Sequence, residues 1–212
     1  MKASWKPPLP PGRVFKKQSL RDLIKTAGFI YQVGESNALR QPSKPVAVTS
    51  IKSEEMQEKI AYLKRCMRKY RKEIGKGRGI AAVQVGIPER FSVIFMPETK
   101  EKLLVVINPT VVKRSKKVLR YPEMCMSANG LIAYVTRPAW VEVEYFTEKG
   151  KKAFWGLKDE TMQGKMYNRV LQHEMDHLNG VINIDTVQSK ELFFESEKAF
   201  YEKATFQEVS SK

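Results

Sequence analysis

Gln172-His173-Glu174-Met175-Asp176-His177 contains both histidines of this 212-residue chain. Histidines four residues apart on a helix project from the same face, so they can bind one metal ion together. Glu174 stands beside them and can act as general base on a water molecule at that ion. The spacing therefore predicts a metal-binding helix with hydrolytic chemistry, and such a site needs a third protein ligand.

The sequence offers three sources for that third ligand. One zinc-protease pattern needs a glycine and then a histidine; Gly180 fits it, but Asn183 stands where the histidine would be. A glutamate downstream is the second source, with three candidates: Glu191, Glu195 and Glu197. Cys125 is the third source, because a thiolate and two imidazoles form a tight ligand set with a position left open. A lone cysteine is also commonly an inert buried thiol.

Two further motifs precede the histidine motif along the chain. They are Gly77-Arg78-Gly79-Ile80-Ala81-Ala82-Val83-Gln84 and Glu123-Met124-Cys125-Met126-Ser127. The three motifs, in this order, resemble those of peptide deformylases. The resemblance covers about residues 30–187. It includes Val33-Gly34, Leu39-Arg40, Arg137, Leu178-Asn179-Gly180 and Asp185.

The resemblance implies a catalytic site and a reaction. Cys125, His173 and His177 are expected to bind one divalent ion, Fe²⁺ in the cell and Zn²⁺ or Ni²⁺ in purified protein. Glu174 is expected to move the proton of the attacking water, while the Gln84 side chain and the Met126 backbone N–H stabilise the oxyanion. The implied reaction is hydrolysis of the N-formyl group of formylmethionyl nascent polypeptides, with release of formate.

The same resemblance implies a substrate pocket, and this chain departs from the family pattern there. The expected lining residues are Gly77, Arg78, Gly79, Ile80, Glu123, Met124, Met166, Arg169 and Val170. Met124 replaces a usual glycine, Asn129 a common proline, and Arg78 and Arg169 replace apolar residues. Because a buried guanidinium without a partner is costly, Arg169 must reach solvent, pair with an acid such as Glu123, or meet a substrate group.

The periodicity of the chain predicts an α+β fold, with short, mostly antiparallel strands around a central metal-binding helix. One helix should begin after Ser53 and the metal-binding helix should span Asp159–Leu178. Strands are expected at Ser92–Met96, at Leu103–Ile107 up to Asn108-Pro109, and in a hairpin of Trp140–Phe146 with Lys152–Leu157. Gly75–Gly86 is expected to be a glycine-rich turn. A last helix should start at Ser189 and bury Leu192, Phe193, Ala199 and Phe200.

Charge and composition bear on organisation and partners. Lys and Arg number 38 against 23 Asp and Glu, a formal net charge of +15. We expect residues 1–28 to be a basic extension, such as a transit remnant, and residues 29–205 to form a single catalytic domain. The charge favours contact with a ribosome or RNA, without sequence-specific nucleic-acid binding. The two cysteines and the lack of a long apolar run predict a soluble intracellular protein with no membrane span.

Two other functions remain open at this point. A diverged homologue could hydrolyse a different N-acyl peptide, which Met124, Arg78 and Arg169 would explain. A catalytically weak, ribosome-associated protein could keep only the fold, although Glu174 argues against it. The expected compartment is the mitochondrion or another organelle, with the bacterial cytoplasm as the alternative.

Overall fold

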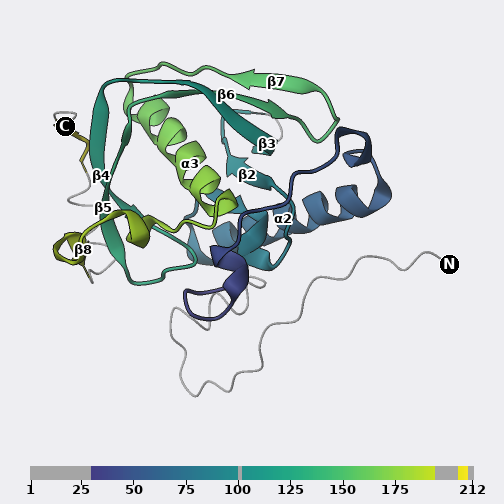
Figure 1. Cartoon of the computed structure of the whole chain (residues 1–212), viewed down its shortest axis with the longest axis horizontal. Coiled ribbons are helices and arrows are strands. Elements are labelled where there is room, and N and C mark those ends of the chain that lie inside the picture. Colours follow the sequence, from purple (N-terminus) through teal and green to yellow (C-terminus); the bar gives the residue numbers. More distant parts are fainter. Residues whose placement is uncertain (1–29, 100–101, 194–204, 210–212) are drawn as a thin grey trace.

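The computed structural model describes residues 30–99, 102–193 and 205–209, and it has the expected α+β architecture (Figure 1). Two antiparallel sheets and two long helices make up this part of the chain. The expected extension at residues 1–28 lies outside the described residues. No described helix combines the length and the apolar character that crossing a membrane requires.

The larger sheet has five strands in the order β1-β2-β3-β6-β7. The strands are β1 (Gly79–Ala81), β2 (Phe91–Phe95), β3 (Leu103–Arg114), β6 (Val141–Phe146) and β7 (Lys152–Trp155). β2 and the β6–β7 hairpin lie where the sequence predicts them. Among the described residues β1 pairs with β2 only, so its other edge is open in this part of the chain.

The smaller sheet has four strands in the order β8-β5-β4-β9. The strands are β4 (Val118–Met124), β5 (Ile132–Pro138), β8 (Leu192–Phe193) and β9 (Gln207–Val209). β4 and β5 form an antiparallel pair over their whole length, and β9 joins β4 from the far end of the chain. The glutamate and cysteine of the middle motif therefore lie at and just beyond the end of β4.

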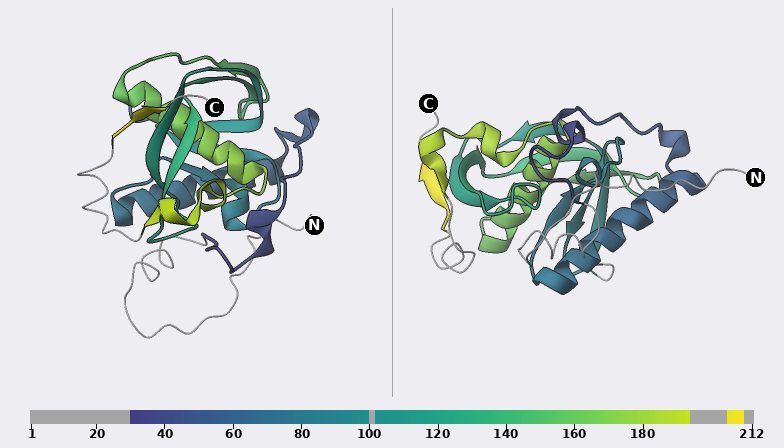
Figure 2. Two further views of the ribbon diagram at one scale, coloured as in Figure 1. Left: turned by 60° about the vertical axis from the view of Figure 1, so that its left-hand side comes forward. Right: turned by 90° about the horizontal axis from the view of Figure 1, so that it is seen from below.

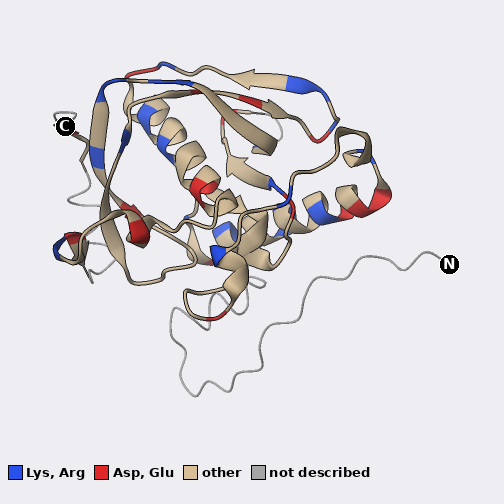
Figure 3. Cartoon of the chain, in the orientation of Figure 1, with Lys and Arg blue, Asp and Glu red and all other residues tan. Residues whose placement is uncertain are grey.

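Helix α2 (Glu54–Ile74) starts as predicted, because the Ser53 side chain accepts a hydrogen bond from the Met56 N–H. Acidic residues at this end, visible in Figure 3, complement the positive end of the helix dipole. The helix ends at Gly75, whose φ of 76° suits glycine. Its apolar stripe, which includes Leu63 and Met67, is buried in the largest core cluster, as expected.

Helix α3 (Met162–Leu178) lies between the two sheets (Figure 2). It begins three residues later than expected, because Thr161 caps it and accepts a hydrogen bond from the Gly164 N–H. The five-stranded sheet separates the two helices: Val93 and Val105 pack in the cluster of α2, whereas Ile94 and Val106 pack in that of α3. This alternation is the period of two that a sheet buried on both faces requires.

Three local expectations were wrong in the described residues. Gly75–Gly86 is not one turn, because it contains strand β1 and a 3-10 turn at Ala82–Val85. No helix starts at Ser189. Ser189–Glu191 form a single 3-10 turn, and Leu192–Phe193 form β8 because they pair with Ile132 and Ala133 of β5. Ala199 and Phe200 lie outside the described residues.

The third wrong expectation is the end of β3 at Asn108-Pro109. The strand continues to Arg114, with a register shift between Ile107 and Thr110 that takes up the proline. Asn108 has a φ of 50°. Its side chain accepts a hydrogen bond from the Val46 N–H at 2.9 Å and donates one to the Val46 carbonyl at 2.7 Å. The two hydrogen bonds of Asn108 to Val46, which lies outside the sheet, therefore stabilise the bulge.

We expect Asn108→Ala to lower the free energy of unfolding by about 2–3 kcal/mol, since it removes both hydrogen bonds and puts alanine at a positive φ. Urea denaturation measures this change. Asn37→Ala, which alters an exposed asparagine, is the control and should stay within about 0.5 kcal/mol of the parent. Equal stability of the two variants would contradict the assigned role of Asn108.

Candidate metal centre

Cys125, His173 and His177 bring three potential ligand atoms within 4.8 Å of one another. The two histidines are one turn apart on α3, and Cys125 comes directly after β4. The Cys125 Sγ lies 3.2 Å from the His177 Nε2, and the two imidazole rings meet edge to face at 4.9 Å between centroids. The fold thus joins two motifs that are 48 residues apart in sequence.

This donor set suits a divalent transition metal. One thiolate and two neutral imidazoles match the ligands that zinc and iron take in proteins, and three protein ligands leave a position for substrate or water. The Ser127 N–H donates to the Cys125 Sγ at 3.3 Å, which holds the sulfur in place. Glu191, one of the alternative third ligands, is instead paired with Arg120 at 3.2 Å. Glu195 and Glu197 lie outside the described residues.

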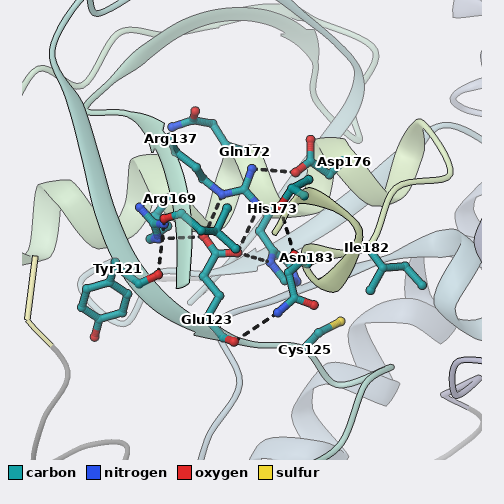
Figure 4. A network of polar contacts seen from close by, with 12 residues as sticks. Tyr121, Glu123, Cys125, Arg137, Arg169, Gln172, His173, Asp176, Ile182 and Asn183 are labelled. Carbon is teal, nitrogen blue, oxygen red and sulfur yellow. Dashed lines mark hydrogen bonds and ion pairs between the residues drawn. The ribbon is translucent and has the colours of Figure 1, made fainter. Parts of the chain in front are cut away.

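Glu123 is the centre of a buried network of charges (Figure 4). Its Oε1 lies 2.7 Å from the Arg137 Nε and 2.7 Å from the Arg169 Nε. Its Oε2 lies 3.0 Å from the Arg137 Nη2 and 3.0 Å from the His173 Nδ1. Burial alone would raise the pKa of the Glu123 carboxyl, but Arg137, His173 and Arg169 hold it far below its usual range.

The contact of Glu123 with His173 orients a potential ligand. Because Nδ1 is held by the carboxylate, Nε2 is the ring nitrogen left for a metal ion. Arg137 also reaches Asp176 on α3, with 2.6 Å between Nη1 and Oδ2, and so links β5 to the helix. Asn183 adds a bond from its Nδ2 to the Glu123 carbonyl at 3.1 Å. The sequence alone assigned Asn183 no role: it only stands where one zinc-protease pattern would have its third histidine.

Glu174 is buried on α3 and its carboxylate packs against Gly79 of β1. A Cβ at position 79 would clash with the Glu174 carboxylate, so a side chain there would displace Glu174 from this position. Glu174 Oε2 has no hydrogen-bond partner among the described residues. Burial raises the pKa of the Glu174 carboxyl to about 7, and a cation bound beside it would lower that pKa. This carboxyl can therefore accept a proton near neutral pH.

Gln84 lies beside the thiolate. Its Oε1 accepts a hydrogen bond from the Ala81 N–H at 2.8 Å, which fixes the direction of the amide. Its Nε2 donates to the Ser127 Oγ at 3.0 Å and lies 3.9 Å from the Cys125 Sγ. Met126 follows Cys125, and its carbonyl accepts a hydrogen bond from the Gln32 Nε2 at 2.8 Å. Gln84 and Met126, two of the expected site residues, are thus held in fixed positions around Cys125.

Arg169 takes one of the three arrangements that the sequence allowed, the ion pair with Glu123. Its guanidinium also donates to the carbonyls of Leu119, Tyr121 and Val135 on β4 and β5. Burial lowers the pKa of Arg169 to about 10, so it stays charged at neutral pH. The side chain therefore fills space beside His173 and does not extend to solvent.

The other expected pocket residues divide into groups. Met124 and Met166 pack with Tyr121 and Phe206 in a small cluster, and Val170 packs against the core of the larger sheet. The Ile80 side chain is fully buried in the α2 cluster. The Glu123 carboxylate is paired with Arg137, Arg169 and His173.

Gly77, Gly79 and Arg78 lie at the open edge of β1. Gly77 has a φ of 96° and its Cα faces the Tyr70 ring, so a side chain there would be strained. Arg78 is exposed between the two glycines. Phe206, which sequence reasoning missed, stacks on Tyr121 with 4.3 Å between ring centroids. No local pattern signals this contact, because β9 reaches β4 from more than 80 residues away.

Comparison with known proteins gives one consistent family. The polypeptide deformylase family model matches residues 29–192. A peptide deformylase of Synechocystis sp. is 33% identical over 168 residues, which are 76% of this chain and 79% of that protein. A peptide deformylase of Rhizobium meliloti is 39% identical over 114 residues, or 52% of this chain and 62% of that protein. Peptide deformylase 1A, chloroplastic, of Solanum lycopersicum is 31% identical over 80% of this chain and 60% of its own length.

Solved structures agree with the sequence comparisons. A peptide deformylase from Legionella pneumophila has a TM-score of 0.66 and 28% identity, over 77% of this chain and 88% of that one. A peptide deformylase from Synechococcus elongatus in complex with actinonin has a TM-score of 0.61 and 34% identity, over 76% and 80% of the two chains.

We expect Arg137→Met to lower the free energy of unfolding of metal-free protein by about 3 kcal/mol or more, because it removes one of the cations that compensate the buried Glu123. The matched control is Asp176→Asn, which removes only the half-buried partner of the same arginine and should cost about 1 kcal/mol or less. Urea denaturation in EDTA measures both. Similar losses in the two variants would contradict the central place of Glu123 in the network.

Proposed function

The chain belongs to the peptide deformylase family, and we propose that it removes the N-formyl group from the amino-terminal formylmethionine of nascent polypeptides. The observation that carries the proposal is the cluster of Cys125, His173 and His177 beside the buried Glu174. Hydrolysis breaks the bond between the formyl carbon and the methionine nitrogen, so the products are formate and a peptide with a free amino terminus.

The three clustered side chains are the proposed ligands of one divalent ion, Fe²⁺ in the cell and Zn²⁺ or Ni²⁺ in purified protein. When bound, such an ion polarises the formyl carbonyl and makes a water molecule nucleophilic near neutral pH. The buried Cys125 sulfur and the His173 ring held by Glu123 support this ligand set, because hydrogen bonds hold both side chains in position.

Glu174 is the proposed general base and acid. Its carboxylate faces Gly79 and has an oxygen without a partner in the described part of the chain, so it is available to take the proton of the attacking water. The same carboxyl then gives this proton to the departing amine, which leaves as the free amino terminus of the peptide. The carboxylate is thus regenerated at the end of the reaction.

Gln84 and Met126 are the proposed donors to the oxyanion. The Gln84 Nε2 lies beside the Cys125 Sγ, and its Oε1 is tied to the Ala81 N–H, so the amide cannot turn its oxygen toward the negative charge. The Met126 N–H directly follows the cysteine in the chain. A preorganised donor of this kind contributes about 3 kcal/mol to the stabilisation of the transition state.

The open edge of β1 is the proposed binding place of the peptide backbone. An extended peptide can add to an exposed strand through main-chain hydrogen bonds. Gly79 lies in β1 directly against Glu174, so a peptide on this edge has its amino terminus at the proposed ligands. Gly77, Arg78, Gly79 and the backbone of Ile80 would then be the contacts along the edge.

A second candidate, hydrolysis of a different N-acyl peptide, is favoured by Arg169. The sequence pattern puts this residue, with Met124, Met166 and Val170, around the side chain of the first substrate residue. The buried guanidinium fills space that an apolar side chain would leave to methionine. Comparing turnover of formyl-Met-Ala with formyl-Ala-Ala, whose first side chain is smaller, separates the two candidates.

The proposed surroundings of the enzyme follow from its relatives and its charge. The relatives include bacterial proteins and a chloroplastic one, so we propose a bacterial cytoplasm or an organelle, with the mitochondrion predicted from the basic residues 1–28. The formal net charge of +15 supports contact with ribosomal RNA, where formylated chains emerge.

We expect Cys125→Ala to lose most of its bound metal, because two histidines alone hold a divalent ion weakly. Cys66→Ala is the matched control, since Cys66 is the other free, buried cysteine and lies in α2 away from the cluster. Metal content per chain after gel filtration is the measurement. Full metal retention by the Cys125 variant would rule out the thiolate as a ligand.

We expect Glu174→Gln to keep its metal and to lose at least about 100-fold in kcat on formyl-Met-Ala, because it removes the base and no ligand. Anaerobically purified, Fe²⁺-loaded protein is the form to assay. Turnover at the parent rate, with metal bound, would mean that another group moves the proton.

A further inference from the structure

Two guanidinium groups lie at the start of the open β1 edge. Arg78 immediately precedes β1, and its side chain is exposed. Arg71 lies in the last turn of α2, donates to the Gly77 carbonyl, and stacks on the Phe95 ring at 3.4 Å from the ring centroid. Neither arginine forms an ion pair with a carboxylate in the described ranges, whereas Lys59, Lys64, Arg137 and Arg169 do.

The two positive charges act on each other and on the neighbouring pocket. Burial lowers the pKa of Arg71, and the charge of Arg78 lowers it further. Arg78 also opposes the rise that burial causes in the pKa of Tyr121 and of Tyr167. Tyr121 packs with Met124 and Met166, so the charge of Arg78 acts on residues beside those expected to line the pocket. An anion bound between the two arginines would relieve their repulsion.

The burial of residues along β1 indicates the direction in which a bound peptide extends. Its first residue has to lie near Gly79, since Glu174 packs there. The residues after Gly79, from Ile80 to Val85, are all buried, whereas Arg78 on the other side is exposed. The exposed side therefore offers a path along which a chain of many residues can continue past Arg78. With a rise of about 3.3 Å per residue, the second and third residues of the peptide come within reach of the Arg78 side chain.

We propose that Arg78, backed by Arg71, selects N-formyl peptides that carry an acidic side chain at the second or third residue. This inference rests on the proposed deformylase function and adds a substrate class to it. Arg71 is held in place by its bond to Gly77 and by the Phe95 ring, so it supplies fixed positive charge. Arg78 is exposed and free to make the charge-assisted hydrogen bond to the carboxylate.

The test compares two C-terminally amidated peptides, formyl-Met-Glu-Glu-amide and formyl-Met-Gln-Gln-amide, on the full-length, Fe²⁺-loaded enzyme at low salt. The amide removes the terminal carboxylate, so the two peptides differ only in side-chain charge. We expect kcat/KM to be about 3- to 10-fold higher for the acidic peptide, mainly through a lower KM, and the ratio to shrink as salt screens the pair.

Three variants locate the effect. Arg78→Gln should bring the ratio of the two kcat/KM values close to one, and Arg78→Glu should reverse the preference. The control Arg65→Gln changes an exposed arginine on α2, about 9 Å along the helix axis from Arg71, and should leave the ratio unchanged. Because Arg78 is exposed and makes no side-chain bond in the described structure, its variants should fold.

The outcomes separate this inference from the function on which it rests. If both peptides are hydrolysed and the ratio is the same in the parent, Arg78→Gln and Arg78→Glu, the inference is wrong and the deformylase function stands. If neither peptide is hydrolysed by the metal-loaded parent, the proposed function fails and the inference fails with it. An equal loss of preference in Arg65→Gln would mean that general surface charge, not Arg78, selects the substrate.

Discussion

The buried carboxylate of Glu123 is the constraint around which the site is arranged. A carboxylate in a dry interior must be compensated, and here two arginines and a histidine surround it. The partners come from two elements of the fold: Arg137 from β5, and Arg169 and His173 from α3. The requirement to neutralise one charge thus holds the β4–β5 pair against the central helix, and it places Cys125, two residues further along, beside the two histidines.

The arginines serve this carboxylate unequally. Arg137 makes two contacts with Glu123 and one with Asp176, so it connects β4, β5 and α3. Arg169 makes one contact with Glu123, and its other N–H groups donate to strand carbonyls, which connects the helix to the sheet. Its side chain thereby fills space beside His173. Tyr121 and Phe206 pack next to it, and β9 brings Phe206 there. The surroundings of Arg169 therefore combine a buried charge with two aromatic rings.

Sequence reasoning reached the features that depend on local pattern. Ser53 and the acids after it predict the start of α2, and the spacing of His173 and His177 predicts that they share a helix face. It failed where a distant contact decides the outcome. Strand β3 continues past Asn108 because the Asn108 side chain hydrogen-bonds to Val46. Leu192 lies in a strand because it pairs with β5. Pairing of Arg169 with an acid was one of three arrangements that the sequence allowed. The positions of Glu123 and of the strand carbonyls explain why this arrangement occurs.

The central claim is that Glu123 prepares His173 to bind metal. Its most direct test is the Zn²⁺ affinity of Glu123→Gln, measured by competition with a chelator on protein that retains the near-UV circular dichroism of the parent. The amide keeps the shape of the side chain but removes the charge that holds the His173 Nδ1. Loss of such a contact typically weakens metal binding by about 10- to 100-fold, and we predict a loss in this range. Parental affinity in the folded variant would contradict the account.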